Sequence, residues 1–348
     1  MRPDKTKELL HIADIKAGLA DLEQSVFTKM EGDEHKSGLL ALKIACDVFE
    51  RLSQGPFPID YNLPRVKECC LHVAAAMDLV RYAKAIKDKA KLKPLKKHLA
   101  LIGVGGFGVA ATYTHQQSKP SAIQELLRKH GVKPLPPEAM KDASRKTIEL
   151  MVGFAALNKF DEIVLEDPEE SNPKDPNPDI IIKTSNATFG VACKSLNSTN
   201  KTNFKERIAE GLRQIDRTID SGKLRSRHGI VLLDISALLD HDLLYMPSHD
   251  HVWSSSHATE VMLAAIDETL SSIFGSSRSL SAKDAFGDLF EGHQAAPCVL
   301  IYAHTLMITS SGNSISPFYM KLMKLLFVGD HSKMKSFAEK LNRGLHCQ

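Results

Sequence analysis

The chain has 348 residues, of which 43% are hydrophobic and 25% are charged, and its formal net charge is +3. This composition is typical of a globular protein and excludes a collagen-like or wholly disordered chain. The length predicts two domains or one large domain with additions, and the nearly balanced charge confines any nucleic-acid surface to a local patch.

The six cysteines show no C-x-x-C spacing, and no apolar run is long enough to cross a bilayer. The first residues do not resemble a signal peptide either. We therefore expect a cytoplasmic protein with reduced thiols and with no membrane partner.

The first 139 residues predict a mainly helical region. Apolar residues recur at helical spacing over 6–30, 38–52 and 63–87. Such a region can recognise a partner protein, pack against the rest of the chain or mediate homo-oligomer formation, and the sequence does not choose among these roles.

The densest basic run in the chain lies over residues 81–97 and includes Lys89, Lys91, Lys93 and Lys96. These lysines form a candidate nucleic-acid interface that would contact phosphates and release counterions. A solvated, lysine-rich helix end explains the same run equally well.

A glycine turn at Gly103, Gly105 and Gly108 fits the G-x-G-x-x-G spacing of dinucleotide-binding proteins. The βαβ unit that such a site needs is missing from the sequence around it. A tight, buried glycine turn is therefore the better interpretation.

The stretch from residue 144 to residue 217 has the most informative pattern. Ile148, Met151, Val152 and Ala155 predict a helix over 144–160, which carries the carboxylate of Glu149. A short strand over 161–166 and a Pro-rich loop over 167–178 follow. We expect a hairpin of strands 179–183 and 188–194, then an amphipathic helix over about 204–219, and then a strand over 228–236.

In the second hairpin strand, Phe189, Val191 and Cys193 share one face, so that Ala192 and Lys194 share the opposite face. The hairpin places Asp179 at one end and Lys194 at the other. Asp179 lies at a boundary between loop and strand, where we expect its carboxylate to be exposed.

At these residues the chain resembles the PD-(D/E)XK nuclease superfamily, in which a helix and a three-stranded meander precede a second helix and another strand. Pro178 and Asp179 match the first half of the family pattern, and Lys194 matches its last position. Glu149 and Gln214 lie where many members carry a helix glutamate and a polar residue on the second helix. The resemblance covers about 140–240.

The resemblance implies phosphodiester hydrolysis assisted by Mg²⁺ or Mn²⁺, which prefer oxygen ligands. Asp179, position 192, the Cys193 carbonyl and Glu149 would surround the metal. Lys194 would act on the attacking water and on the charge of the phosphate.

The acidic position of the family pattern is Ala192 in this chain. Three interpretations compete: an engineered replacement of Glu by Ala, an acid that has migrated to Glu206 or Glu210 on the second helix, and a fold that has lost catalysis. An ordinary α/β domain with a solvent-facing Asp and Lys is a fourth interpretation, since such a pair is common.

The remaining sequence predicts a helix over 257–274, a strand over 297–308 and a basic helical tail over 318–345. A loop with His249 and His251, followed by His257, suggests a zinc site. Because the loop lacks a fixed pattern of further ligands, an exposed histidine-rich loop is the preferred interpretation.

Together these patterns predict an α/β protein with a restriction-endonuclease-like mixed central sheet flanked by helices. We expect a mainly helical region over 1–139, a nuclease-like domain over 140–348, and a metal-dependent endonuclease that acts on DNA. By resemblance, its setting would be prokaryotic restriction or phage defence. The alternatives are a non-catalytic nucleic-acid-binding or assembly module and, more remotely, a nucleotide-binding protein.

Overall fold

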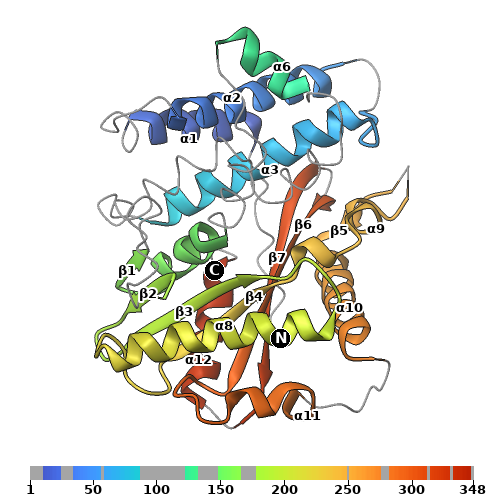
Figure 1. Ribbon diagram of the computed structural model, residues 1–348. Helices are drawn as coiled ribbons and strands as arrows, with labels where there is room; N and C mark the ends of the chain where they lie inside the picture. Colours follow the sequence, from blue (N-terminus) through green and yellow to red (C-terminus); the bar gives the residue numbers. More distant parts are fainter. Residues whose placement is uncertain are drawn as a thin grey trace.

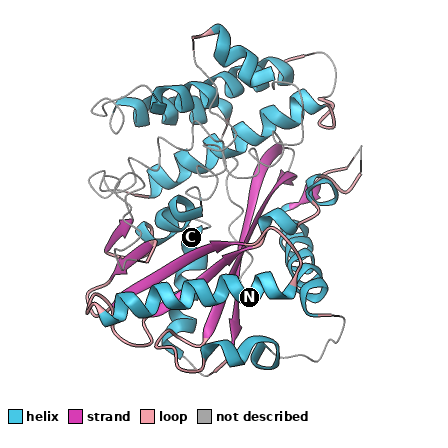
Figure 2. Cartoon of the chain, in the orientation of Figure 1, coloured by secondary structure: helices cyan, strands magenta, loops and turns pink. Residues whose placement is uncertain are grey.

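The computed structural model describes residues 11–24, 34–55, 59–86, 122–131, 148–165, 178–248, 251–275, 282–311, 314–329 and 332–345. The protein is α/β, with one mixed, curled sheet between two layers of helices (Figures 1 and 2). Each face of the sheet contributes to its own hydrophobic core. No helix in these ranges is both long and apolar enough to cross a membrane.

The predicted helix and three-stranded meander are present. Residues 148–157 are helical, and Ile148, Met151, Val152 and Ala155 are buried. Strands β1 (Glu162–Leu165), β2 (Ile180–Lys183) and β3 (Thr188–Ser195) follow, and each pairs antiparallel with the next. The periodicities of 3.6 and 2 therefore predict this part of the fold correctly.

The chain then crosses one face of the sheet as helix α8 (Lys201–Asp220) and returns as strand β4 (Gly229–Asp234), parallel to β3. The side chain of Asn200 accepts a hydrogen bond from the Thr202 N–H and caps the start of α8. Figure 1 shows α8 lying across β3 and β4, where its apolar side is buried (Phe204, Ile208, Leu212 and Ile215).

Beyond β4 the sheet continues with the long strand β6 (Cys298–Ser311), which is parallel to β4 and to the short strand β5 (Trp253–Ser254). Helices α9 (His241–Tyr245), α10 (Ser255–Phe274) and α11 (Ala282–Phe286) lie between these strands in the chain. The short 3₁₀ helices η3 (Ser236–Leu238) and η4 (Gly287–Phe290) complete this part. The predicted helix over 257–274 and strand over 297–308 are confirmed.

The predicted helical tail over 318–345 is wrong in its first half. Residues Ser314–Phe327 form strand β7, which pairs antiparallel with β6 along its whole length, and only Ser332–Leu345 forms a helix, α12. Tyr319 belongs to the core on one face of the sheet and Met320 to the core on the other. Both faces of β7 are covered and both carry apolar residues, so the strand lacks the alternation that distinguishes a half-exposed strand.

The described N-terminal part consists of helices α1 (Ile12–Leu22), α2 (Glu34–Ser53), α3 (Pro64–Ala85) and α6 (Ala122–Lys129). Its buried residues join the core that also contains residues of the sheet and of α12. Tyr82 on α3 stacks on Phe154 and donates a hydrogen bond to the Leu345 carbonyl. Of the three roles left open for this region, packing against the rest of the chain is observed.

Candidate functional site

The candidate site lies where β2 begins beside β3. The strand register places Ile180 opposite Val191, so that Asp179 comes opposite Ala192 one step further along. Residues directly opposite in an antiparallel pair have side chains on the same face. Ala192 belongs to the core beneath α8, whereas Val191 belongs to the core on the other face. Position 192 therefore faces α8, on the side of the sheet that the sequence predicted for it and Lys194.

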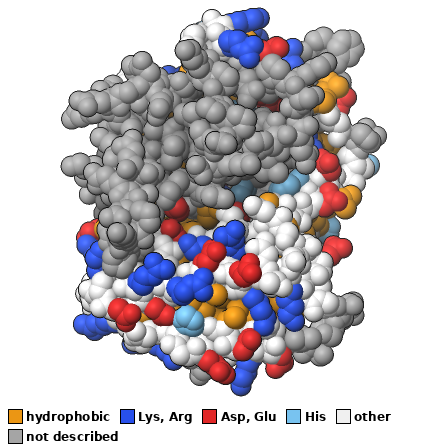
Figure 3. Space-filling model, in the orientation of Figure 1, with side chains coloured by type: hydrophobic (Ala, Val, Ile, Leu, Met, Phe, Trp, Pro, Cys, Tyr) orange, Lys and Arg blue, Asp and Glu red, His pale blue; other side chains and the backbone are white. Residues whose placement is uncertain are grey.

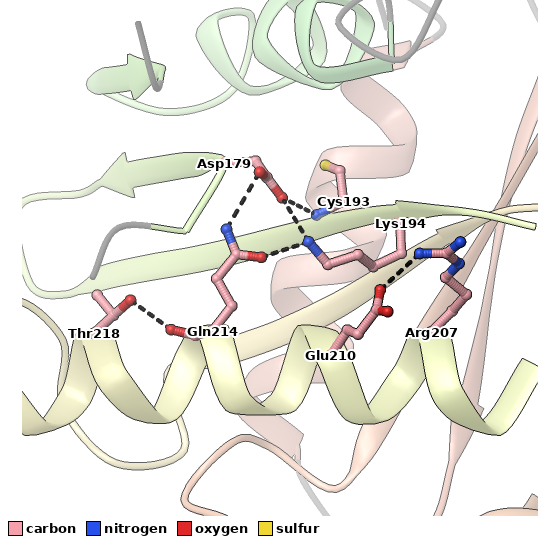
Figure 4. Close-up of polar contacts among 7 residues, drawn as sticks. All are labelled: Asp179, Cys193, Lys194, Arg207, Glu210, Gln214 and Thr218. Atoms are coloured by element: carbon pink, nitrogen blue, oxygen red, sulfur yellow. Dashed lines mark hydrogen bonds and ion pairs between the residues drawn. The ribbon is translucent and has the colours of Figure 1, made fainter. Parts of the chain in front are cut away.

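Gln214 on α8 connects Asp179 with Lys194 (Figure 4). The Lys194 Nζ donates to the Gln214 Oε1 at 2.6 Å, and the Gln214 Nε2 donates to the Asp179 Oδ1 at 3.3 Å. The Lys194 Nζ also lies 3.9 Å from the Asp179 Oδ2. The Gln214 amide thus presents its carbonyl to the ammonium and its N–H to the carboxylate, so that each donor of this arrangement faces an acceptor.

Asp179 is buried, with a side chain only 10% exposed, which corrects the expectation of an exposed carboxylate. Its Oδ2 accepts a hydrogen bond from the Cys193 N–H at 2.5 Å, while its Oδ1 accepts from Gln214. Although Asp179 lies at a boundary between loop and strand, its side chain is not exposed. Its carboxylate lies between β3 and α8, where it accepts hydrogen bonds from a backbone donor and a side-chain donor. Asp179 has a structural role in addition to any role in chemistry.

A glycine lets α8 approach the sheet closely enough for these contacts. A Cβ on Gly211 would lie 2.8 Å from both methyl carbons of Val231 on β4, much closer than side chains pack. Gly211 precedes Gln214 by about one helical turn. The small residue thus fixes the height of α8 above the sheet and brings Gln214 within reach of Lys194.

The residues present at the site lack one oxygen ligand of the divalent metal that the resemblance implies. Mg²⁺ and Mn²⁺ need several oxygen ligands, and Ala192 offers no side-chain oxygen, while each oxygen of Asp179 already accepts one hydrogen bond. Throughout the described ranges, no three His, Cys, Asp or Glu side chains come together in a group that could hold a metal ion. With alanine at position 192, the hydrogen-bonded network of Asp179, Lys194 and Gln214 contains one carboxylate.

The other candidate acids lie on the two flanking helices. Glu149 is buried on the helix over 148–157, and its membership of the site stays a prediction. Glu206 on α8 is exposed, whereas Glu210 accepts a hydrogen bond from the Arg207 guanidinium at 2.8 Å. The migrated-acid interpretation therefore requires either that the exposed Glu206 turns inward or that Glu210 leaves Arg207.

Some predicted functional residues lie outside the residues that the structure describes. These are the basic strip, the glycine turn and one loop histidine (Lys89, Lys91, Lys93, Lys96, Gly103, Gly105, Gly108 and His249). The described histidines of the suggested zinc site have other partners: His251 contacts Ser248, and His257 contacts Glu260. These contacts agree with the interpretation of an exposed histidine-rich loop.

The polar groupings that the sequence reasoning missed include the following two. One is the ion pair of Arg207 and Glu210 beside Lys194 (Figure 4). Their three-residue spacing on α8 was a usable signal. The other is a buried chain of hydrogen bonds through Asp234, Ser236 and His304, of which the last lies 68 residues beyond Ser236 and gave no local signal.

Comparison of the chain with protein-family models, with curated proteins and with solved structures finds no match. The resemblance described above therefore depends on the residues themselves and on the order of the elements around them.

Proposed function

We propose that this protein is a DNA-binding protein with a restriction-endonuclease-like fold of the PD-(D/E)XK type, and that it hydrolyses phosphodiester bonds only when position 192 carries a carboxylate. One observation carries the proposal. Asp179, Lys194 and Gln214 form one hydrogen-bonded network from β2, β3 and α8, and Ala192 lies directly opposite Asp179. Those are the positions at which the family pattern has its functional residues.

The order of the elements supports the same proposal. A helix, a three-stranded antiparallel meander, a second helix and a parallel strand follow one another from residue 148 to residue 234. An ordinary α/β domain with a solvent-facing Asp and Lys does not explain the buried Asp179 or its contact with Gln214.

Each residue of the network has a chemical role in this proposal. The ammonium of Lys194, 20% exposed, can donate to the oxygens of a backbone phosphate and offset their charge. Gln214 holds the ammonium at a fixed place above β3, and Asp179 orients the amide of Gln214. A lysine held in this way spends less conformational entropy on binding a phosphate than a free surface lysine does.

The second candidate function is a non-catalytic nucleic-acid-binding or assembly module on the same fold. It is favoured by the burial of Ala192, whose side chain packs in the apolar core beneath α8. In its nucleic-acid-binding form, the second candidate shares the DNA-binding site with the first and differs from it in whether a carboxylate at position 192 turns binding into cleavage. The proposed setting in restriction or phage defence depends on resemblance alone.

Fluorescence anisotropy of a labelled duplex in EDTA tests whether the protein binds DNA at this site. Replacement of Lys194 by alanine should weaken binding of a labelled duplex and lower the salt slope by about 0.9, the value for one lost phosphate contact. Lys183→Ala is the matched control, because Lys183 is a β2 lysine paired with Glu162 at 2.7 Å. Absence of binding by the unmodified protein, or equal losses in the two variants, would contradict the proposal.

A further inference from the structure

Arg207 lies on the same side of α8 as Gln214, the residue that holds Lys194. Arg207, Glu210 and Gln214 are spaced by three and four residues, which places them along one stripe of the helix. Figure 4 shows all three side chains on the side of α8 toward Lys194. Arg207 thus extends the positive charge of the site along the helix.

The ion pair between Arg207 and Glu210 is weak. Arg207 donates to Glu210 at 2.8 Å, and the two side chains are 41% and 42% exposed. Exposed ion pairs contribute about 0.2–1 kcal/mol, because water screens them and long side chains lose entropy. A phosphate is the same kind of acceptor as a carboxylate and can take its place on a guanidinium.

The spacing along α8 fits a chain of phosphates. Seven residues separate Arg207 from Gln214, which corresponds to roughly 10 Å of helix. One DNA strand carries a phosphate about every 3.4 Å of its axis, so the two ends of the stripe would contact different phosphates. Figure 3 shows other Lys and Arg side chains around this side of the molecule, interspersed with acidic ones.

We propose that Arg207 is a second phosphate-binding residue of the DNA site, and that in the free protein Glu210 occupies the place of that phosphate. DNA bound at Lys194 continues along α8 toward its N-terminal half. Its backbone phosphate displaces the Glu210 carboxylate from Arg207 without any metal ion. This inference rests on the proposed DNA-binding function and adds a second contact to it.

Two opposite substitutions test the inference by anisotropy with a labelled duplex in EDTA over a series of salt concentrations. Arg207→Ala should weaken binding and lower the salt slope by about 0.9. Glu210→Gln should strengthen binding by roughly two- to fivefold, the factor that corresponds to an exposed ion pair of about 0.4–1 kcal/mol. When Arg207 is already replaced by alanine, adding Glu210→Gln should strengthen binding much less, because no guanidinium remains to be released from Glu210.

Lys205→Ala is the matched control. Lys205 is also on α8, but it pairs with Asp288 at 3.1 Å on another side of the helix. Its replacement removes the same charge from the same helix and should leave the salt slope unchanged. Circular dichroism of each variant checks that α8 is retained.

The outcomes separate this inference from the function on which it rests. If Lys194→Ala weakens binding but Arg207→Ala behaves like Lys205→Ala, DNA binding stands and the role of Arg207 is overturned. If Glu210→Gln strengthens binding equally with and without Arg207, the displacement of Glu210 is overturned, since the gain then reflects only the lost negative charge. If the unmodified protein binds no DNA, the proposed function itself fails.

Discussion

At the scale of single residues, Asp234, Ser236 and His304 form a buried chain of hydrogen bonds. The Ser236 Oγ lies 2.5 Å from the Asp234 Oδ1 and 2.8 Å from the His304 Nδ1. An ionised carboxylate only accepts, so the Ser236 hydroxyl donates to Asp234 and accepts from the His304 ring N–H. This arrangement requires that His304 carries a proton on Nδ1.

Burial shifts the two titratable groups of this chain in opposite directions. It raises the pKa of Asp234 to about 6, although the hydrogen bonds from Ser236 oppose this shift. It lowers the pKa of His304 to about 3, and the nearby His241 and Lys321 lower it further. Each shift disfavours the charged form of a group that has little contact with water.

We expect the two shifts to offset each other in the dependence of stability on pH. As pH falls from about 6 toward 3.8, folded Asp234 takes up a proton before the unfolded chain does, which adds stability. As pH falls from 6.5 toward about 3, the unfolded chain protonates His304 and the folded protein does not, which removes stability. Each effect is at most about 1.4 kcal/mol per pH unit, with opposite signs.

Urea unfolding between pH 6 and pH 4 checks this expectation. Relative to the unmodified protein, Asp234→Asn should lose stability as the pH falls, since only the His304 effect remains, and His304→Gln should gain it. The comparison is made at each pH, so that contributions from other carboxylates cancel. Stability differences that do not change with pH in either variant would show that the pair does not titrate as described.

At the scale of elements, the site depends on the height of helix α8 above β3 and β4. Gly211 and Gly229 lie at this contact, and a Cβ at either position would clash with a side chain opposite. At Gly211 both methyl groups of Val231 are too close, and Val231 lies on β4 between β3 and β6. A side chain at position 211 must therefore raise α8 or distort its packing.

Gly211→Ala should destabilise the protein by about 1–3 kcal/mol, the usual cost of an overpacked contact, even though alanine favours helix formation. Because α8 would rise from β3, the variant should also bind DNA more weakly than its stability alone explains. Val231→Ala removes the clashing methyl groups and, in the double variant, should restore much of the DNA affinity. A single variant that is as stable and as tightly binding as the unmodified protein would contradict the close contact.

The sequence predicts the elements around the site well because their apolar residues alternate or recur on one face. That signal locates β1, β2, β3, α8 and β4, and it predicts the shared face of Ala192 and Lys194. It fails for β7, which is apolar on both faces. It also fails for the burial of Asp179, because that depends on donors from β3 and α8 that only the folded chain brings together.

At the scale of the whole molecule, a buried ion pair joins the N-terminal helices to the sheet. Lys321 on β7 donates to Asp78 on α3 at 2.5 Å and to the Tyr82 hydroxyl at 3.1 Å. The side chains of the two charged residues are only 3% and 5% exposed. This contact and the shared core indicate that α3 and the sheet depend on each other, while the proposed division at residue 139 stays a prediction.

Lys321→Met should destabilise the protein by about 3–5 kcal/mol, because it leaves Asp78 charged and buried without a partner. The double variant with Asp78→Leu should cost much less, since no charge remains buried. Lys324→Met is the control: Lys324 lies on the same strand, but its pair with Asp267 is exposed and should contribute less than about 1 kcal/mol.

Two signals follow this unfolding. Circular dichroism reports mainly on the helices, and the fluorescence of the single tryptophan, Trp253, reports on the surroundings of β5. The two urea transitions should coincide in the unmodified protein. Two separate transitions would show that the helices and the surroundings of Trp253 do not unfold as one unit, and equal losses in Lys321→Met and Lys324→Met would contradict the role of the buried pair.

The central claim is that position 192 is the missing acidic position of a phosphodiester site. A carboxylate there would stand opposite Asp179, beside Lys194, and paired carboxylates are the ligands that Mg²⁺ prefers. Ala192→Gln is the matched control, because glutamine brings a polar side chain of the same size into the core without the charge. Both variants carry the same steric cost at this buried position.

The most direct measurement is digestion of a supercoiled plasmid by the Ala192→Glu variant with Mg²⁺ or Mn²⁺ and with EDTA. We expect cleavage with metal, no cleavage with EDTA, and no cleavage by Ala192→Gln or by Ala192→Glu combined with Lys194→Ala. A folded, DNA-binding Ala192→Glu variant that cuts nothing with either metal would contradict the claim. Metal-dependent cleavage by the unmodified protein would also contradict it, because the acid of the site would then lie elsewhere, with Glu210 the first position to replace.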